Sequence, residues 1–165
     1  MEKLKIYRIK DKYVRYLHGA DHRVQDNKAQ HRPYVGVVLL VGSYKYFVPM
    51  ESPKPNHKNI KNGKHIMRLD KGTLGLLGFN NMIPVPDTAL ISFDIDAEPD
   101  VKYADLLRRQ AAYINRHKAE VYQRASDTYY AVVNNTNKFL VGISCDFKKL
   151  EFASKRYNPN FVKKK

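Results

Sequence analysis

Patterned and unpatterned stretches alternate along the first third of the chain. Apolar and polar residues alternate along residues 4–9, which predicts a half-buried strand. Asp11 is then positioned to cap a short helix, whose apolar positions are Tyr13, Val14, Tyr16 and Leu17. Residues 18–32 are polar and have no periodicity, so we expect a long loop. Loops of this length are uncommon in compact domains unless they have a function.

The strongest pattern lies in residues 34–49, YVGVVLLVGSYKYFVP. Two runs rich in β-branched and aromatic residues flank Gly42-Ser43, which predicts a β-hairpin with glycine at the turn. The first run is apolar on both faces and therefore predicts a central, buried strand. We expect Pro49 to end the hairpin. The prolines and the glycine in residues 50–65 exclude regular structure there.

Helical and extended patterns alternate in the rest of the chain. Short strands are predicted over residues 65–69, 74–79, 89–95 and 138–145. Residues 101–133 have helical spacing, and this stretch exceeds the usual helix length, so we expect two helices with a break near residues 115–117. Asp146 is positioned to cap a last helix.

This order of elements predicts one α+β domain over residues 1–158, built around a twisted, mostly antiparallel sheet with flanking helices. Residues 159–165 are expected to form a loose, basic tail. The N-terminus has charges inside every apolar stretch and is not a signal peptide. No apolar run approaches the roughly 20 residues of a membrane-spanning helix. The single cysteine, Cys145, has no partner for an internal disulfide, which favours the reducing cytoplasm.

The charge narrows the choice of partner. The chain has 30 Lys and Arg against 16 Asp and Glu, a formal net charge of +14. Such a field attracts polyanions, and Lys and Arg contacts to phosphates release counterions, so nucleic acid is the preferred partner. An acidic protein partner, or a charge that serves solubility alone, remains open. A membrane surface is disfavoured because there is no basic amphipathic helix with a clean apolar face.

Most cofactor chemistry has no support in the sequence. The six histidines do not have zinc-ligand spacing beside cysteine pairs or acids, so we expect no metal site. Asp94 and Asp96 would suit magnesium if they faced one side of a strand, although a solvated strand end is the more common arrangement. The glycine-rich loops that bind nucleotides are absent. We therefore expect no cofactor.

One segment carries the residue types of metal-free RNA cleavage. Ser52-Pro53-Lys54 follows the hairpin, with Glu51 before it and His57 after it. RNA is cut when its own 2′-OH attacks the neighbouring phosphate. A protein assists by moving protons and by offsetting the charge on the phosphate. A loop of this composition is also compatible with a simple solvated turn.

Further cations and aromatic residues are candidates for contacts to RNA. Many tyrosines lie beside Lys or Arg, which allows bases to stack while cations hold phosphates. Half-buried core positions are the alternative for these tyrosines. The RNA-binding candidates are Tyr13, Tyr34, Lys58, Lys61, Lys64, Arg108, Arg109, Arg116 and Lys118.

Three blocks taken together resemble a known family. These are HRPYVGVVLLVGSYKYFVP with the following SPK, then LGLLGFNNMIPVP, then GISCDFKKLEFASKRY. They resemble the ToxN/AbiQ/CptN/TenpN family of type III toxin–antitoxin endoribonucleases, and the similarity runs from about Ile6 to Tyr157. The resemblance implies a sheet related to Kid/MazF-like toxins. It also implies metal-independent cutting of A-rich RNA, which leaves a 2′,3′-cyclic phosphate and a 5′-OH.

The resemblance also implies partners and roles in the cell. A small RNA pseudoknot, which the toxin processes from a repeat transcript, would inhibit the enzyme in a closed, ring-like protein–RNA complex. Release of the toxin would act in abortive infection against phage. A non-catalytic RNA-binding protein of ribosomal or chaperone type is the alternative, because charge and tyrosines require no active site.

The family's functional positions map onto this sequence residue by residue. The Ser-Pro-Lys motif falls on Ser52, Pro53 and Lys54, the basic residue before the buried strand on Arg32, the aromatic residue of the first helix on Tyr13 and the histidine on His57. Glu51 stands where relatives commonly have threonine, and Asn56 replaces an aromatic residue. We expect Lys54 and Arg32 to stabilise charge, Ser52 to donate a hydrogen bond, and Glu51 or His57 to carry the proton.

Overall fold

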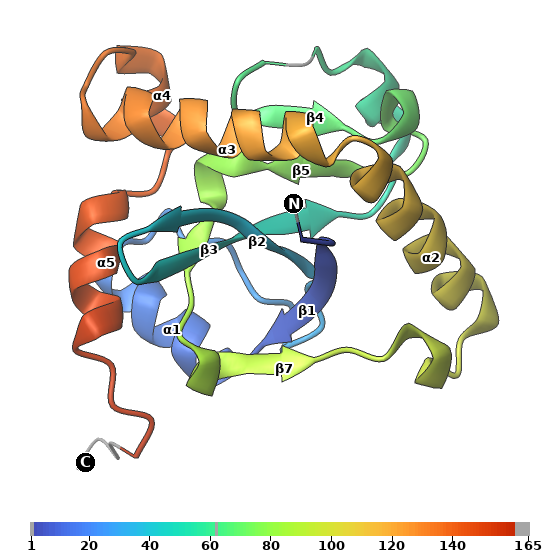
Figure 1. Cartoon of the computed structure of the whole chain (residues 1–165), viewed down its shortest axis with the longest axis horizontal. Helices are drawn as coiled ribbons and strands as arrows, with labels where there is room; N and C mark the ends of the chain where they lie inside the picture. The colour runs from blue at the N-terminus through green and yellow to red at the C-terminus, as the bar shows by residue number, and fades with distance from the viewer. Residues whose placement is uncertain (1, 62, 161–165) are drawn as a thin grey trace.

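A β-hairpin forms the middle of the structure (Figure 1). Its strands are β2 (Tyr34–Val41) and β3 (Tyr44–Glu51), and Gly42 at the turn has the positive φ of +58° that the hairpin prediction requires. The computed structural model describes residues 2–61 and 63–160 of the chain. The start of β2 is buried on both faces, as predicted for a central strand.

The described strands form one antiparallel sheet in the order β4-β5-β3-β2-β1-β7, with β6 paired to β3. The sheet confirms the predicted fold class. A Kid/MazF-like core stays a prediction. The remaining strands are β1 (Lys5–Ile9), β4 (Ile66–Arg68), β5 (Leu76–Gly78), β6 (Ile83–Pro84) and β7 (Leu90–Ser92).

Five α-helices flank the sheet within the described residues (Figure 1). The predicted break near residues 115–117 is confirmed, because one helix ends at Arg116 and the next begins at Lys118. Short 3-10 turns lie in the connections: η1 (Pro55–Asn59) between β3 and β4, η2 (Asp70–Gly72) between β4 and β5, and η5 (Ile95–Ala97) between β7 and α2. The helices are α1 (Asp11–Ala20), α2 (Val101–Arg116), α3 (Lys118–Val133), α4 (Lys138–Ile143) and α5 (Phe147–Lys155).

Four local predictions are wrong. Residues 50–65 were expected to lack regular structure, but Pro55–Asn59 form the 3-10 helix η1, because Pro55 begins the turn and His57 N–H bonds to the carbonyl of Lys54. The strand expected over residues 138–145 is instead the short helix α4, capped by the Asn137 side chain, which accepts a hydrogen bond from Leu140 N–H. A short apolar run does not distinguish a strand from a helix, and the cap decides. β3 continues past Pro49 because Met50 and Glu51 pair with β5. Asp11 lies in the first turn of α1 rather than at its cap.

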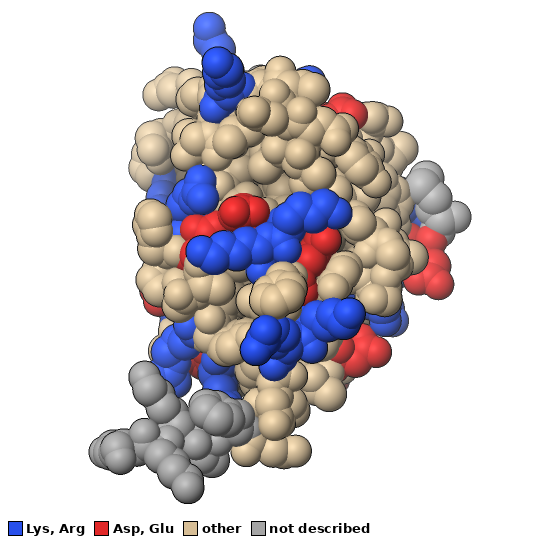
Figure 2. Space-filling model, turned by 90° about the vertical axis from the view of Figure 1, so that its left-hand side faces the viewer, with Lys and Arg blue, Asp and Glu red and all other residues tan. Residues whose placement is uncertain are grey.

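The two signs of charge are mixed on the side formed by α4, α5 and the hairpin turn (Figure 2). Lys45 lies 3.2 Å from Asp87, and Lys148 lies 3.5 Å from Glu151. This side therefore does not present an uninterrupted basic surface. Among the described residues, no helix has both the length and the apolar character needed to cross a bilayer.

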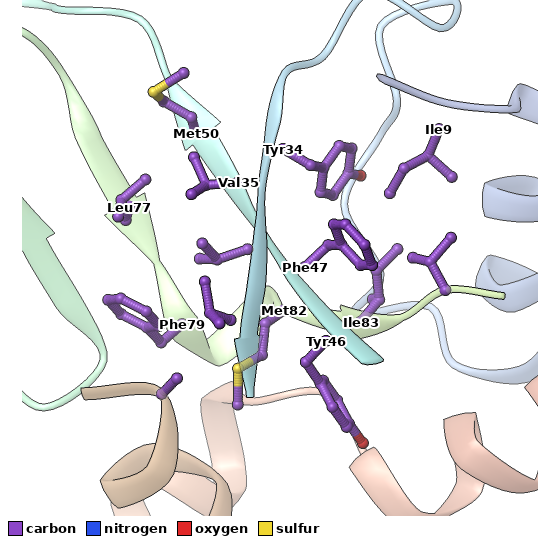
Figure 3. Close-up of a cluster of buried hydrophobic side chains, with 14 of the residues drawn as sticks. Ile9, Tyr34, Val35, Tyr46, Phe47, Met50, Leu77, Phe79, Met82 and Ile83 are labelled. Carbon is purple, nitrogen blue, oxygen red and sulfur yellow. The ribbon is translucent and has the colours of Figure 1, made fainter. Parts of the chain in front are cut away.

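The core fills both faces of the hairpin (Figure 3). Tyr34 and Phe47 lie on the side of α1, whereas Val35, Met50 and Leu77 lie on the opposite side. The alternation follows from the period of two along each strand, which sends successive side chains to opposite faces. Apolar residues of β2 and β3 therefore hold the end of β3 in place from both sides.

Tyr13 and Tyr34 belong to this core, which corrects their assignment to an RNA surface. Their side chains are 0% and 1% exposed, and the Tyr13 hydroxyl donates a 2.5 Å hydrogen bond to the carbonyl of Pro84. Burial raises the pKa of both hydroxyls. Both rings lie in the apolar interior because a tyrosine can bury its ring when its hydroxyl finds a partner.

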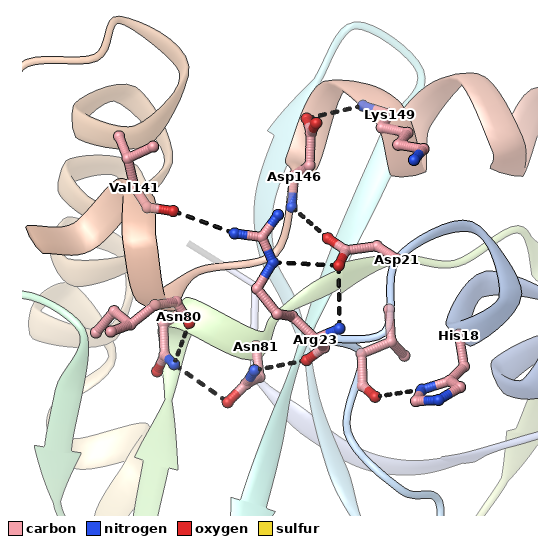
Figure 4. A network of polar contacts seen from close by, with 10 residues as sticks. His18, Asp21, Arg23, Asn80, Asn81, Val141, Asp146 and Lys149 are labelled. Atoms are coloured by element: carbon pink, nitrogen blue, oxygen red, sulfur yellow. Dashed lines mark hydrogen bonds and ion pairs between the residues drawn. The ribbon is translucent and has the colours of Figure 1, made fainter. Parts of the chain in front are cut away.

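A polar network joins the end of α1 to the start of α5 (Figure 4). Asp21 accepts hydrogen bonds from Asp146 N–H at 2.7 Å, from Arg23 N–H at 3.0 Å and from the Arg23 guanidinium at 3.2 Å. Burial would raise the pKa of Asp21, but these hydrogen bonds and the Arg23 charge outweigh it and lower the pKa. Asp146 also caps α5 as predicted, by accepting from Lys149 N–H.

Candidate active site

The end of β3 fixes the first residue of the candidate site. Glu51 is the last residue of the strand and pairs with Leu76 of β5. On the other side, Met50 N–H donates a 3.0 Å hydrogen bond to the carbonyl of Pro33. Strand pairing on both sides holds the backbone here, and the chain then leaves the sheet at Ser52. The predicted Ser-Pro-Lys segment therefore starts from a rigid point.

His57 folds back under this segment through η1. Its N–H donates to the carbonyl of Lys54 at 3.0 Å, and the Lys54 N–H donates to Nδ1 of His57 at 3.3 Å. Nε2 of the same ring lies 3.4 Å from Oε2 of Glu51. The structure thus brings Glu51, Lys54 and His57 together, as the sequence predicted.

Burial separates the roles of Glu51 and His57. The His57 side chain is 1% exposed, whereas that of Glu51 is 30% exposed. Because Nδ1 of His57 accepts the Lys54 N–H, the proton of the neutral ring lies on Nε2, which faces Glu51. His57 therefore orients the carboxylate from behind, and Glu51 is the member of the pair that reaches the surface.

Two glycines that the sequence analysis did not single out make this packing possible. A Cβ on Gly72 would lie 2.7 Å from the carbonyl oxygen of His57, and one on Gly75 would overlap the carbonyl oxygen of Glu51. Both glycines also have positive φ values, +92° and +98°. The signal in the sequence is the spacing KGTLG, but only the fold shows what the glycines approach.

The other predicted catalytic residues differ in exposure. Ser52 and Lys54 are exposed beside Glu51. Arg32 is only 7% exposed, and its Nε donates a 2.7 Å hydrogen bond to the carbonyl of Asp26. Its Nη1 is buried and has no hydrogen-bond partner among the described residues. Arg32 is thus a buried cation rather than a side chain of the exposed surface.

The predicted RNA-binding cations fall into two groups. Lys58, Lys61 and Lys64 are exposed and follow the Ser52-Pro53-Lys54 segment in the sequence. Arg108 pairs with Asp96 at 2.8 Å, and Arg109 lies 3.9 Å from Asp105. The second group lies on α2 and at the start of α3 and comprises Arg108, Arg109, Arg116 and Lys118.

A cavity of about 750 Å³ lies beside this second group, between β1, α2 and the segment after β7. Arg108 lines it, but none of the predicted catalytic residues does. The carboxylates considered for magnesium are nearby and already engaged, because Asp94 accepts from Asp96 N–H and Asp96 pairs with Arg108. The cavity is therefore separate from the candidate active site.

No cluster of metal ligands stands out in the described part of the chain. Within it, no three His, Cys, Asp or Glu side chains lie close enough to hold an ion together. Cys145 is buried, and burial and nearby Asp21 raise the pKa of its thiol to about 12. A thiol in this state is a poor nucleophile. The groups that the candidate site offers are a carboxylate, an imidazole, a hydroxyl and an ammonium group.

Comparison with known proteins identifies the family. The model of the family described as "Toxin ToxN, type III toxin-antitoxin system" matches residues 5–155. The chain belongs to the ToxN family. This ToxN-family chain is 33% identical over 162 residues to endoribonuclease ToxN of Bacillus thuringiensis subsp. kurstaki, covering 93% of this chain and 84% of that protein. It is 28% identical to endoribonuclease AbiQ of Lactococcus lactis subsp. lactis, covering 94% and 90%.

Solved structures of ToxN relatives agree with the fold. A toxin from a study of selective inhibition by a non-coding RNA pseudoknot matches with a TM-score of 0.85 and 30% identity, covering 96% of this chain and all of that one. The structure of AbiQ, a lactococcal anti-phage endoribonuclease, matches with a TM-score of 0.83 and 26% identity, covering 94% and 98%. The predictions of the ToxN family and of a type III toxin of the endoribonuclease class are confirmed.

Proposed function

We propose that this ToxN-family protein cuts A-rich single-stranded RNA at the end of β3, without a metal ion. The observation that carries the proposal is the Glu51–His57 pair, 3.4 Å apart, beside exposed Ser52 and Lys54. Transesterification needs a proton acceptor and groups that stabilise charge on the phosphate. The partly exposed Glu51 carboxylate, oriented by His57, provides the first, and the hydroxyl and ammonium groups of Ser52 and Lys54 provide the second.

Each residue has one role in this mechanism. Glu51 accepts the proton of the 2′-OH as its oxygen attacks phosphorus, and the bond from phosphorus to the 5′-oxygen breaks. Lys54 offsets the negative charge that develops on the phosphate, and Ser52 donates a hydrogen bond to a phosphate oxygen. The leaving 5′-oxygen takes up a proton from solvent, and Glu51 returns its proton to solvent. The products are a 2′,3′-cyclic phosphate and a 5′-OH.

Arg32 acts at longer range. Its guanidinium is buried beside the start of β2, and Met50 bonds to the neighbouring Pro33, so its backbone runs alongside that of Glu51. In the protein interior a positive charge is screened less than in water, so it stabilises a phosphate dianion without touching it. The buried Nη1 without a partner supports this role, since such a group is expensive unless a negative charge lies nearby.

The relatives support a proposal for the inhibitor of the protein and for its role in the cell. We propose that an RNA pseudoknot, processed by this protein from a repeat transcript, covers the site in a closed, ring-like complex. The net charge of +14 supports an RNA inhibitor. The structural relatives come from work on toxin inhibition by a non-coding RNA pseudoknot, on an anti-phage endoribonuclease and on a processed RNA in an antiviral system. In this proposal the protein acts on cellular or phage RNA in the cytoplasm.

The test is cleavage of a labelled A-rich RNA by purified protein in EDTA, with the product ends mapped. We expect cutting with a 2′,3′-cyclic phosphate end. Lys54→Ala should lower the rate by about 10²-fold, the cost of removing one charge-stabilising donor. Lys155→Ala on α5 removes the same charge near Tyr44 and Lys45, at the opposite end of β3 from Glu51, and is the control.

Three outcomes would contradict the proposal or a part of it. Tight RNA binding without cutting, from protein freed of co-purified RNA by unfolding and refolding, would favour a non-catalytic RNA-binding protein. Cutting that stops in EDTA and returns with magnesium would contradict the metal-free mechanism. An equal loss of rate in Lys54→Ala and Lys155→Ala would show that general charge, rather than Lys54 itself, matters.

A further inference from the structure

An exposed aromatic ring lies on α4, outside the candidate active site. Phe139 is 64% exposed, although the preceding Asn137 caps the helix and the following Leu140 is 2% exposed. The short helix is thus anchored by one apolar residue while it presents another to solvent. A single exposed phenylalanine is common on protein surfaces, so only its surroundings can indicate a partner for the ring.

The ring of His65 lies against Phe139, with centroids 5.8 Å apart in an edge-on arrangement. Burial and the neighbouring Arg124 lower the pKa of His65, so its ring is neutral at pH 7. The two rings come from segments far apart in sequence, the loop before β4 and the first turn of α4. We call the surface formed by His65 and Phe139 the aromatic platform.

Helix α3 holds both halves of the aromatic platform in place. Arg124, paired with Glu120 at 2.9 Å, donates hydrogen bonds to the carbonyls of Gly63 and Ile66. Thr128 donates a 3.0 Å hydrogen bond to the carbonyl of Lys64. α3 leads directly into α4 and packs against it (Figure 1). The platform is therefore preorganised, which reduces the entropy lost when a ligand binds.

The surroundings of the platform are basic. No Asp or Glu occurs between Glu51 and Asp70, nor between Asp127 and Asp146, and these are the two segments that meet at the platform. Within them, the side chains of Lys58, Lys61, Lys64 and Lys138 are exposed. Acids are thus absent from both segments, although the wider side of the molecule that includes α4 and α5 carries both signs of charge (Figure 2). A ligand for this surface should combine an aromatic face with negative charge.

The platform is also continuous with the candidate active site. Glu51 pairs with Leu76, which pairs with Arg68, and His65 lies three residues before Arg68. Strand spacings of about 4.8 Å and a rise of about 3.3 Å per residue place His65 about 14 Å from Glu51. Arg68 donates a 2.9 Å hydrogen bond to the carbonyl of Lys58, so the catalytic segment and β4 are directly joined. A few nucleotides of extended RNA would span this distance.

We propose that a base of the RNA substrate, a few nucleotides from the cut, stacks on the aromatic platform of Phe139 and His65 while its phosphates follow Lys58, Lys61 and Lys64. Aromatic rings bind bases of any identity by stacking, and cations beside them hold the backbone. The platform therefore positions the strand rather than reacting with it. This inference rests on the proposed nuclease function and adds a binding subsite to it.

The experiment measures binding of a short A-rich RNA by fluorescence anisotropy, with the mapped cut site blocked by a 2′-deoxy nucleotide. Phe139→Leu should weaken binding by about tenfold, the effect of losing one stacked base. Phe139→Tyr should restore it. Phe152→Leu is the matched control, because Phe152 is 61% exposed on α5 and Arg156 lies over its ring at 5.3 Å.

Abasic nucleotides locate the stacked base. One base at a time is removed on either side of the cut. At one position, we expect the abasic RNA to bind wild type about tenfold more weakly than intact RNA does, whereas Phe139→Leu should bind both RNAs equally. Equal losses in both proteins at every position would overturn the proposal, as would equal effects of Phe139→Leu and Phe152→Leu. Thermal unfolding checks that the variants fold. Cleavage of unblocked RNA by wild type separates failure of the platform from failure of the nuclease function.

Discussion

At the scale of single residues, the pair of Glu51 and His57 carries the proposed mechanism. A carboxylate beside an RNA backbone would repel phosphate if it were free to point outward. His57, buried behind it and 3.4 Å away, supplies a hydrogen-bond donor that fixes its orientation. We therefore expect Glu51 to act as the general base and His57 to act through it.

The first prediction separates the base from the residue that positions it. Glu51→Gln should lower kcat by about 10²-fold or more and leave RNA affinity nearly unchanged, because the amide cannot accept the proton. His57→Gln should lower kcat less. If His57 acts only through Glu51, the double variant should lose no more than Glu51→Gln alone.

Single-turnover rates and RNA affinities of the four proteins provide the measurement. Losses that simply multiply in the double variant would show that His57 acts independently, as a second proton carrier. Because His57 is buried, the unfolding midpoint of each variant is measured alongside. A kcat that falls in proportion to stability would point to a structural role.

The sequence also has limits at this scale. It singled out the Ser-Pro-Lys segment and its neighbours, because they bring several reactive residue types close together in the chain, and their catalytic roles stay a prediction. It placed Tyr13 and Tyr34 at an RNA surface, whereas they are core residues. The sequence pattern alone does not show which tyrosine side chains are buried in the core. Nor does it show that Gly75 approaches Glu51, since that contact exists only once β5 pairs with β3.

At the scale of elements, strong local signals were sufficient and weak ones were not. The hairpin and the two long helices each have a periodic pattern of apolar residues that extends over many positions. Both predictions are confirmed. The short apolar run at 138–145 has no such length, and α4 forms because Asn137 caps it and Leu140 fits the core. Tertiary contacts decided what the pattern left open.

The network around Asp21 ties elements together, so its loss should be felt in stability rather than in catalysis. Asp21→Asn replaces a buried carboxylate that accepts from Asp146, Arg23 and the Arg23 guanidinium. We expect a loss of about 2 kcal/mol in the free energy of unfolding at pH 7, the range for hydrogen bonds to charged groups. Urea unfolding measures it. Asp87→Asn, at an exposed pair with Lys45, is the control and should cost under about 0.5 kcal/mol.

The pH dependence gives this prediction a sign. The pKa of Asp21 is lower in the folded protein than its ordinary value of 3.8, so the unfolded chain binds the proton more readily. The contribution of Asp21 is therefore fully present above about pH 5 and is lost as the pH falls below 4. The difference in the free energy of unfolding between wild type and Asp21→Asn should shrink as the pH falls below 4. A difference that stays constant down to pH 3 would contradict the role of the charge.

At the scale of the whole molecule, the net charge of +14 is unevenly distributed. The α5 side mixes both signs (Figure 2), whereas the segments from Glu51 to Asp70 and from Asp127 to Asp146 contain no acid between their ends. Long-range attraction brings RNA to the protein from any direction. We expect the lysines of these two segments to hold the phosphates, because contacts rather than net charge release counterions.

The salt dependence of RNA binding distinguishes attraction by the overall electrostatic field from direct contacts between lysines and phosphates. The logarithm of RNA affinity should fall linearly with the logarithm of salt concentration, with a slope of about −0.7 for each phosphate held on a single strand. Replacing Lys58, Lys61 and Lys64 with alanine should flatten that slope by about 2. Replacing Lys149, Lys155 and Arg156 removes the same charge from the α5 side and should leave the slope nearly unchanged, while lowering affinity slightly at low salt. Titrations of blocked RNA between about 50 and 200 mM salt provide the slopes. If both triple variants flatten the slope equally, RNA is bound by the overall field, and the basic path from Glu51 to the aromatic platform is wrong.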